Sequence, residues 1–294
     1  MVSGLIGYAV GNINTGLAKW MCIFLIFGSI KMAWGFVSLV LLPDSPSTTY
    51  FLSPREKAVA VGRVAANRQG IKNHVFKPYQ AVQMMKDPKT WILFLMAVTG
   101  QIPTAAITSL ASINITSFGF GTLSSQYMLI PGGAVQFFGM LFGGWVATKW
   151  PNMRCVVMIV ANSICIVGAG FLVGLSAEKK GRLVALWLCY TQALGFSMSL
   201  TMISSNIAGY TKKQLTAAVV FMGFCAGNVA GPQTFITSEA PGYHTAYLSM
   251  LIAYGLKLAL AIILYVYMFV SNKHRDMERG LVILSEKEVI ELGM

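Results

Sequence analysis

Seven apolar stretches dominate this chain, and each is long enough to cross a lipid bilayer, which takes about 20 helical residues. They cover residues 21–42, 91–113, 123–147, 155–175, 183–206, 215–237 and 246–270. Charged residues make up only 11% of the 294 residues, whereas soluble domains carry about 25%. The sequence therefore predicts an all-α integral membrane protein that crosses the lipid bilayer several times.

The positive charge lies mainly in the loops on one side of the predicted membrane. The net charge is +12, and 16 of the 22 Lys and Arg residues fall in one set of loops, against 4 in the other. The larger set comprises Arg55, Lys57, Arg63, Arg68, Lys72, Lys77, Lys86, Lys89, Lys149, Arg154, Lys212, Lys213, Lys273, Arg275, Arg279 and Lys287, and the smaller comprises Lys19, Lys179, Lys180 and Arg182. Loops rich in Lys and Arg stay in the cytoplasm, so the central loop and the C-terminus are predicted to be cytoplasmic. No basic face interleaved with aromatic residues is present, so no nucleic-acid partner is expected.

One long polar stretch divides the chain into parts. We expect an N-terminal part over 1–42, a central loop over 43–90, a helix bundle over 91–270 and a tail over 271–294. In the loop, Ser53 and Glu56 have the spacing of a capping box, and Pro54 suits a first helical position. This predicts a short amphipathic helix over about 54–68, and a disordered linker is the alternative.

Several motifs resemble one family of membrane transporters. They are LPDSP at 42–46, FLSPREKAVAVGRV at 51–64, DPKTWILFL at 87–95, GFG at 119–121, PNMR at 151–154, GYTKK at 209–213 and GFCAGNVAGPQTF at 223–235. Together they resemble the allantoate permease branch of the anion:cation symporters, within the major facilitator superfamily.

That resemblance implies a protein of the plasma membrane whose fold consists of two six-helix halves. The segment 1–13 then corresponds to the end of the fifth helix, 21–42 to the sixth, and 91–270 to the second six-helix bundle. On this interpretation residues 1–42 are a remnant of an N-terminal helix bundle that is mostly missing from the chain and would be its partner.

Small residues recur every four positions in three segments. The stripes are Gly223, Gly227 and Gly231 followed by Pro232, Gly139 and Gly143, and Ser3, Gly7 and Gly11. Such stripes let two helix backbones approach closely. The resemblance implies that these helices line the interface between the two halves, where Pro232 permits a bend. Static packing within one bundle is the alternative.

Two of the apolar stretches carry polar residues along one helical face. The candidates are Gln101, Thr104 and Thr108 in 91–113, and Trp187, Tyr190, Thr191, Ser197 and Thr201 in 183–206. The resemblance implies that both helices line the substrate cavity, so these side chains are predicted to contact a small organic anion. The alternative is that the hydroxyl groups bond to other helices or to carbonyls of their own helix.

Two lysines, Lys31 and Lys257, lie near the middle of apolar stretches, where a charge costs about 2.5–3.5 kcal/mol. One interpretation is that they attract an anionic substrate. The favoured one is snorkelling or a local hydrogen bond, because the sixth and twelfth helices of the family's fold support its outside. No acid or His lies in a stretch, so a proton carrier, if protons are the coupling ion, is expected on helices absent from this chain.

The loop before residue 155 departs from the family pattern. Thr148 stands where many members keep an acid, and Lys149 and Arg154 retain the basic charge. These two residues are candidates for an inner gate without the acidic partner that the family pattern has at position 148.

Three functions remain open from the sequence. The first is a transporter, or a fragment of one, for small organic anions such as allantoate, ureidosuccinate or vitamin-like carboxylates. The others are a seven-helix receptor-like sensor and a truncated product that does not transport. The sequence contains no P-loop, zinc-ligand spacing or nucleophile triad, so no enzyme activity, cofactor or metal is expected.

Overall fold

The computed structural model describes residues 18–43, 49–66, 76–109, 115, 121–150, 152–175, 179–240 and 242–291. Within these ranges the chain is helical and contains no strand. The helices are α2 (Lys19–Leu41), α3 (Pro54–Ala66), α4 (Pro78–Lys86), α5 (Pro88–Ser109), α7 (Thr122–Lys149), α8 (Arg154–Gly174), α9 (Lys179–Cys189), α10 (Gln192–Asn206), α11 (Tyr210–Gln233), the 3-10 helix η1 (Thr237–Glu239) and α12 (His244–Glu291).

Seven segments of the described chain are long and apolar enough to cross a membrane, which confirms the predicted number. They lie in α2, α5, α7, α8, the α9–α10 pair, α11 and α12. Residues 1–17 lie outside the described residues, and with them Gly7 and Gly11. The last helix continues to Glu291, beyond the predicted boundary at residue 270, and its sequence contains no Pro that would interrupt it.

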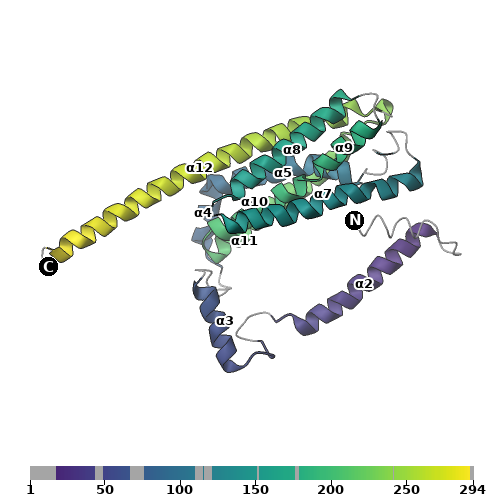
Figure 1. Cartoon of the computed structure of the whole chain (residues 1–294). Coiled ribbons are helices and arrows are strands. Elements are labelled where there is room, and N and C mark those ends of the chain that lie inside the picture. Colours follow the sequence, from purple (N-terminus) through teal and green to yellow (C-terminus); the bar gives the residue numbers. More distant parts are fainter. Residues whose placement is uncertain are drawn as a thin grey trace.

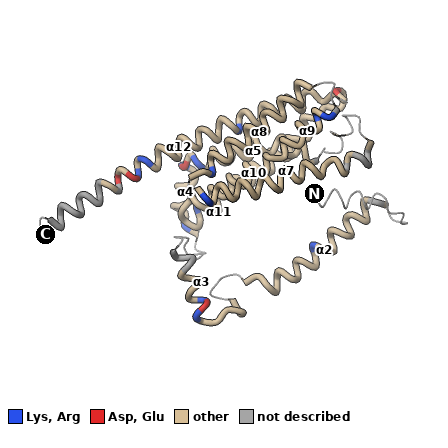
Figure 2. Tube along the Cα trace, in the orientation of Figure 1, with Lys and Arg blue, Asp and Glu red and all other residues tan. Residues whose placement is uncertain are grey.

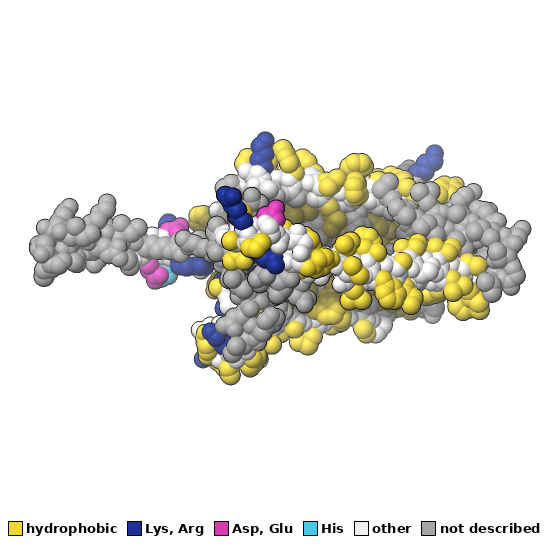
Figure 3. All heavy atoms as spheres, turned by 90° about the horizontal axis from the view of Figure 1, so that it is seen from below, with side chains coloured by type: hydrophobic (Ala, Val, Ile, Leu, Met, Phe, Trp, Pro, Cys, Tyr) yellow, Lys and Arg dark blue, Asp and Glu magenta, His cyan; other side chains and the backbone are white. Residues whose placement is uncertain are grey.

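Helices α5 and α7 to α12 form one bundle, and α2 lies apart from it (Figure 1). One cluster of the bundle's core contains Leu93, Met96 and Met158, and a second contains Leu172 and Leu186. Large apolar side chains are exposed on the outside of the bundle, such as Phe138 of α7, Phe171 of α8 and Ile263 of α12. On the face shown in Figure 3, most of the visible Lys and Arg side chains lie towards one end. An apolar outside is what a helix bundle presents to lipid tails.

The α9–α10 pair replaces the single straight helix expected over 183–206. In the turn, the backbone N–H groups of Tyr190, Thr191, Ala193 and Leu194 each bond to the carbonyl three residues earlier, beginning with Tyr190 N to Trp187 O at 3.2 Å. The Thr191 hydroxyl also donates to Leu188 O at 2.6 Å. Short 3-10 segments inside a helix often mark a hinge or a site under strain.

The central loop contains two short helices. At the start of α3, Ser53 N donates to Glu56 Oε2 at 2.9 Å and Glu56 N donates to Ser53 Oγ at 3.4 Å, which is the capping-box geometry. The second helix, α4, was not anticipated, although Pro78 at its first turn is a typical helix-start signal. It packs against α11 at the end of the bundle where α5 and α11 begin.

Candidate functional site

A buried polar group lies where α5, α10 and α12 meet. Lys257 of α12 is 2% exposed, and its Nζ donates to Gln192 Oε1 at 2.8 Å. Gln192 Nε2 in turn donates to the carbonyl of Gly100 at 2.9 Å. Of the two favoured expectations for Lys257, the local hydrogen bond describes the structure, and snorkelling towards the outside does not. We call Lys257, Gln192 and Gly100 the lysine node.

Polar residues of α8 lie beside the irregular turn between α9 and α10. Thr191 Oγ1 lies 3.1 Å from Cys165 Sγ. Asn162 donates from Nδ2 to the carbonyl of Tyr254 at 2.7 Å, and its buried Oδ1 has no hydrogen-bond partner among the described residues. Buried polar groups in an apolar bundle are costly unless they are paired. In this region the helices are therefore held together by polar contacts as well as by apolar packing.

The aromatic candidates pack against α7. Trp187 Nε1 donates to the carbonyl of Met128 at 2.9 Å. A Cβ atom added to Gly132 would lie 3.0 Å from the Tyr190 ring and 3.2 Å from Trp187. Gly132 therefore gives both rings room to lie against the α7 backbone, and the two aromatic side chains join the irregular turn to α7.

The remaining candidates for the cavity are spread over the bundle. Gln101 is buried at the contact with α11, and Asn228 Nδ2 lies 3.5 Å from its Oε1. Ser197 is half-buried on α10. Thr104, Thr108 and Thr201 donate their hydroxyl groups to carbonyls of their own helices, at 2.8, 2.8 and 2.7 Å. Each oxygen keeps its capacity to accept a hydrogen bond.

The glycine stripe of α11 lies directly against α5. Cβ atoms added to Gly223, Gly227 and Gly231 would lie 2.8, 2.5 and 2.5 Å from the carbonyl oxygens of Phe94, Val98 and Ile102, respectively. These contacts between two backbones lie within one bundle. We call this contact the α5–α11 seam, and Pro232 follows it near the end of α11.

The glycines of α7 have different surroundings. A Cβ added to Gly139 meets nothing within 4 Å, whereas one added to Gly143 would lie 2.5 Å from the side chain of Leu194. Phe138 and Phe142 nearby are exposed. Around Gly139, α7 therefore has an open face.

Most Lys and Arg residues lie at the end of the bundle where α7 ends and α8 and α11 begin (Figure 2). We call this the basic end. Lys149 Nζ lies 4.8 Å from the ring centre of Trp145, and Arg154 Nη1 donates to Ser205 Oγ at 2.5 Å. A cavity of about 1310 Å³ opens beside Arg154. Its walls come from α7, α8, α10 and α12, and they include Thr148, Thr201 and Lys273.

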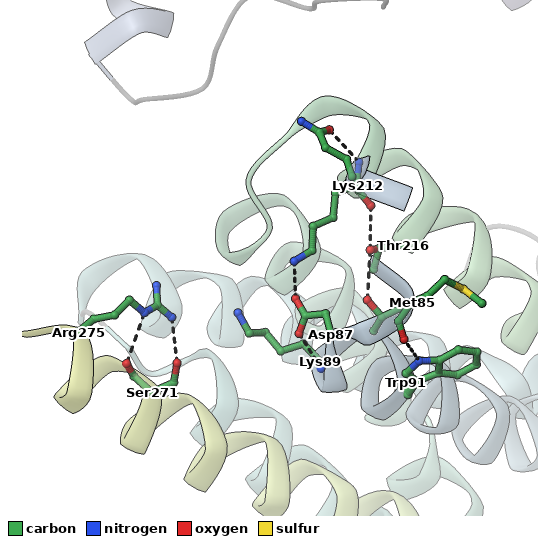
Figure 4. Close-up of polar contacts among 10 residues, drawn as sticks. Met85, Asp87, Lys89, Trp91, Lys212, Thr216, Ser271 and Arg275 are labelled. Atoms are coloured by element: carbon green, nitrogen blue, oxygen red, sulfur yellow. Dashed lines mark hydrogen bonds and ion pairs between the residues drawn. The ribbon is translucent and has the colours of Figure 1, made fainter. Parts of the chain in front are cut away.

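An ion pair fastens the start of α5 to α11 at the basic end (Figure 4). Lys212 Nζ lies 2.6 Å from Asp87 Oδ2, with the two side chains 19% and 9% exposed. Asp87 Oδ1 also accepts from Lys89 N at 3.1 Å. Beside this pair, the hydroxyl groups of Thr90 and Thr216 lie 3.4 Å apart. These contacts close the α5–α11 seam at its basic end.

The sequence analysis missed Gln192 and Gly100. Both lie within predicted membrane-spanning stretches, and Gln192 directly follows the candidate Thr191. The available signal was Lys257, because a cation in the middle of a span requires an acceptor on a neighbouring helix. A polar residue in the middle of another span, such as Gln192, was the natural partner to seek.

Comparison with known proteins agrees with this architecture. The chain is 35% identical to the allantoate permease of Saccharomyces cerevisiae over 93% of its own length and 52% of that protein. It is 31% identical to an uncharacterized transporter of Schizosaccharomyces pombe, over 94% of this chain and 53% of the relative. The thiamine pathway transporter of Saccharomyces cerevisiae is 27% identical over 95% of this chain and 54% of its own length.

The chain thus spans about half the length of these curated relatives, which are transporters rather than enzymes. Residues 1–232 match the sequence pattern of the Major Facilitator Superfamily. A bundle of membrane-length helices with a polar centre is consistent with that match. The chain belongs to the major facilitator superfamily.

Proposed function

We propose that this chain forms part of a transporter that carries small organic anions across a membrane by alternating access. The observation that carries the proposal is the 35% identity to a protein named allantoate permease over 93% of this chain. Allantoate is therefore the first candidate substrate, with ureidosuccinate and vitamin-like carboxylates as further members of the same chemical class. Protons are the proposed coupling ion.

The bundle supplies two features that such a mechanism needs. Transporters of this kind bind their solute near the middle of the membrane, often at discontinuous helices. The irregular turn between α9 and α10 and the lysine node provide polar groups at that depth. The candidates Gln101, Thr104, Thr108, Trp187, Tyr190, Thr191, Ser197 and Thr201 are proposed to act around this region, with Lys149 and Arg154 at an inner gate.

We propose that the protein lies in the plasma membrane with its basic end facing the cytoplasm. This orientation follows from the excess of Lys and Arg in that set of loops. We further propose that α2 belongs with a second helix bundle, because none of its apolar membrane-length window is buried against the rest of this chain. The open face of α7 is the proposed contact for that second bundle.

Uptake measurements test the function. Cells that produce this chain, alone or together with the first half of the yeast allantoate permease, are supplied with radiolabelled allantoate. We expect saturable uptake that unlabelled carboxylates inhibit and that a protonophore abolishes. Absence of uptake in both settings, together with absence of allantoate binding to the purified chain, would reject the proposal. Uptake that the protonophore leaves unchanged would reject proton coupling alone.

A further inference from the structure

Lys257 is a buried cation of the bundle, and it forms no salt bridge with an acid among the described residues. Every Asp and Glu of the chain lies outside the apolar parts of the spans, at positions 44, 56, 87, 178, 239, 276, 278, 286, 288 and 291. The salt bridges of the described residues join Lys212 to Asp87 and His274 to Glu278. The hydrogen-bond partner of the Lys257 ammonium is instead the neutral amide of Gln192. An ammonium group has three N–H donors, so one amide oxygen satisfies only part of its capacity.

Two glycines give the lysine its path from α12 into the bundle. A Cβ added to Gly100 of α5 would lie 3.0 Å from Lys257 Nζ, and one added to Gly195 of α10 would lie 3.5 Å from it. The ammonium therefore lies between α5 and α10, the two helices that carry five of the candidate substrate residues, namely Gln101, Thr104, Thr108, Ser197 and Thr201. A lysine that snorkels would extend towards water instead, and Lys257 is only 2% exposed.

A second polar contact lies on the neighbouring part of α5. Gln101 directly follows Gly100, and its Oε1 lies 3.5 Å from Asn228 Nδ2 of α11. The Lys257 ammonium thus approaches α5 at Gly100, and the next residue of α5 carries the amide that meets Asn228. Charges in a dry, low-dielectric interior act more strongly on one another than charges in water do. An unpaired cation at this place therefore favours an anion close by.

We propose that Lys257 provides the positive charge that holds the anionic group of the transported solute at the junction of α5 and α10, with Gln192 fixing the position of the ammonium. This inference rests on the proposed function, because it names the group that recognises the anion. The ligand is defined by its chemistry, which is a small molecule with one carboxylate and polar uncharged groups beside it. Lys257 is the residue that contacts the ligand, Gln192 acts as a positioning residue, and the carboxylate provides the counter-charge that the apolar parts of the spans lack.

The test compares two charge-removing variants with a matched control. Lys257→Met keeps the length of the side chain but removes both its charge and its hydrogen bond. Lys257→Gln removes the charge and retains a hydrogen-bonding group. Lys31→Met removes a mid-span lysine from α2, which lies apart from the bundle (Figure 1). All variants are purified in lipid nanodiscs, and their melting temperatures identify those that fold.

The measured quantity is the dissociation constant for radiolabelled allantoate and for its uncharged primary amide. Both Lys257 variants are expected to bind allantoate at least about tenfold more weakly, a change of about 1.4 kcal/mol, and to bind the amide as the wild type does. Lys31→Met is expected to match the wild type for both compounds. A purely structural role of Lys257 would weaken the binding of both compounds equally.

Three results would overturn the inference. The first is unchanged allantoate binding in folded Lys257→Gln or Lys257→Met. The second is an equal loss for allantoate and the amide. The third is a wild-type chain that binds neither compound, and this result removes the proposed substrate class as well. The first two results leave the proposed function intact, so the two failures are distinguishable.

Discussion

The same small-residue spacing has different structural consequences in α11 and in α7. In the α5–α11 seam, Gly223, Gly227 and Gly231 lie against backbone carbonyl groups of α5. In α7, a Cβ added to Gly139 would meet nothing within 4 Å, although Gly139 and Gly143 have the same spacing of four. The spacing makes close approach possible, and the helix that lies opposite determines whether it occurs.

The difference separates two kinds of region in this molecule. The α5–α11 seam joins two helices whose apolar windows are 56% and 28% buried, whereas the windows of α7 and α2 are 11% and 0% buried. The stability of the helices in the seam depends on contacts between parts of the chain that are distant in sequence. The stability of helices outside the seam, including α3, depends more on interactions within the helix itself. Each region is therefore expected to respond to different substitutions.

The largest expected effect is that of a bulky residue in the seam. In Gly227→Leu the new side chain would collide with Val98 O and with Gln101 Cβ, which lie 2.5 and 2.6 Å from the added Cβ. Backbone cannot rotate away as a side chain can, so we expect a loss of about 3 kcal/mol or more. Thermal unfolding in detergent, followed by tryptophan fluorescence and by size-exclusion chromatography, measures this loss.

The matched control is Gly139→Leu in α7. It adds the same side chain to a helix glycine with the same spacing, but into open space. We expect an unchanged melting temperature in the purified chain. Equal destabilisation by the two variants would mean that the distinction between the seam and the open face is wrong.

The next effect concerns the ion pair that closes the seam at the basic end. Asp87→Ala removes the partner of Lys212 and the acceptor of Lys89 N, and both carboxylate contacts are largely shielded from water. We expect a loss of about 2 kcal/mol, because partly buried ion pairs and helix caps each contribute on the order of 1 kcal/mol. The same unfolding measurement at low and moderate salt checks this value.

The exposed pair of His274 and Glu278 provides the comparison. Its atoms lie 3.8 Å apart and its side chains are 72% and 63% exposed. Glu278→Ala is therefore expected to leave the melting temperature unchanged, as is typical of surface pairs. A loss as large as that of Asp87→Ala would show that burial does not distinguish the two pairs.

The sequence was sufficient for the features that depend on local pattern. Length and apolar composition predicted seven spans, and the structure contains seven such segments. Ser53, Pro54 and Glu56 indicated the start of a helix, and α3 begins at Pro54. In each case the residues that determine the feature are close together in the chain. No knowledge of the partner helix was needed.

Features that depend on which helices meet were not predictable in this way. The stripe of α11 does not encode that its neighbour is α5, because a glycine allows many partners to approach. Lys257 is surrounded in sequence by apolar residues on nearly every side, so its helical face gave no direction. The turn at Tyr190 and Thr191 contains neither Gly nor Pro, which are the usual signals of an irregular helix.

The smallest expected effect concerns α3, which lies outside the seam. Hydrogen bonds from Ser53 hold the pKa of Glu56 below its ordinary value of 4.5, since they favour the charged carboxylate. A carboxylate whose pKa is lower in the folded state stabilises that state above its unfolded pKa. This stabilisation is lost as the pH falls through the folded pKa. We therefore expect the first turn of α3 to fray as the pH decreases from about 5 to about 3, while the contacts of Gly223, Gly227 and Gly231 with α5 persist.

NMR chemical shifts of the α3 backbone in the isotope-labelled chain measure this fraying. In Glu56→Gln the capping box keeps an acceptor for Ser53 but no longer titrates, so its helical shifts are expected to stay constant over the same pH range. Signals from Gly223 to Gly231 serve as the internal reference, because this part of α11 lies beyond the Lys212–Asp87 ion pair, which closes the seam at its basic end. Fraying of α3 in Glu56→Gln to the same extent as in the wild type would place the pH-sensitive group elsewhere. In that case α3 would depend on contacts beyond its own residues, as the seam does, and the division between the two kinds of region would not extend to α3.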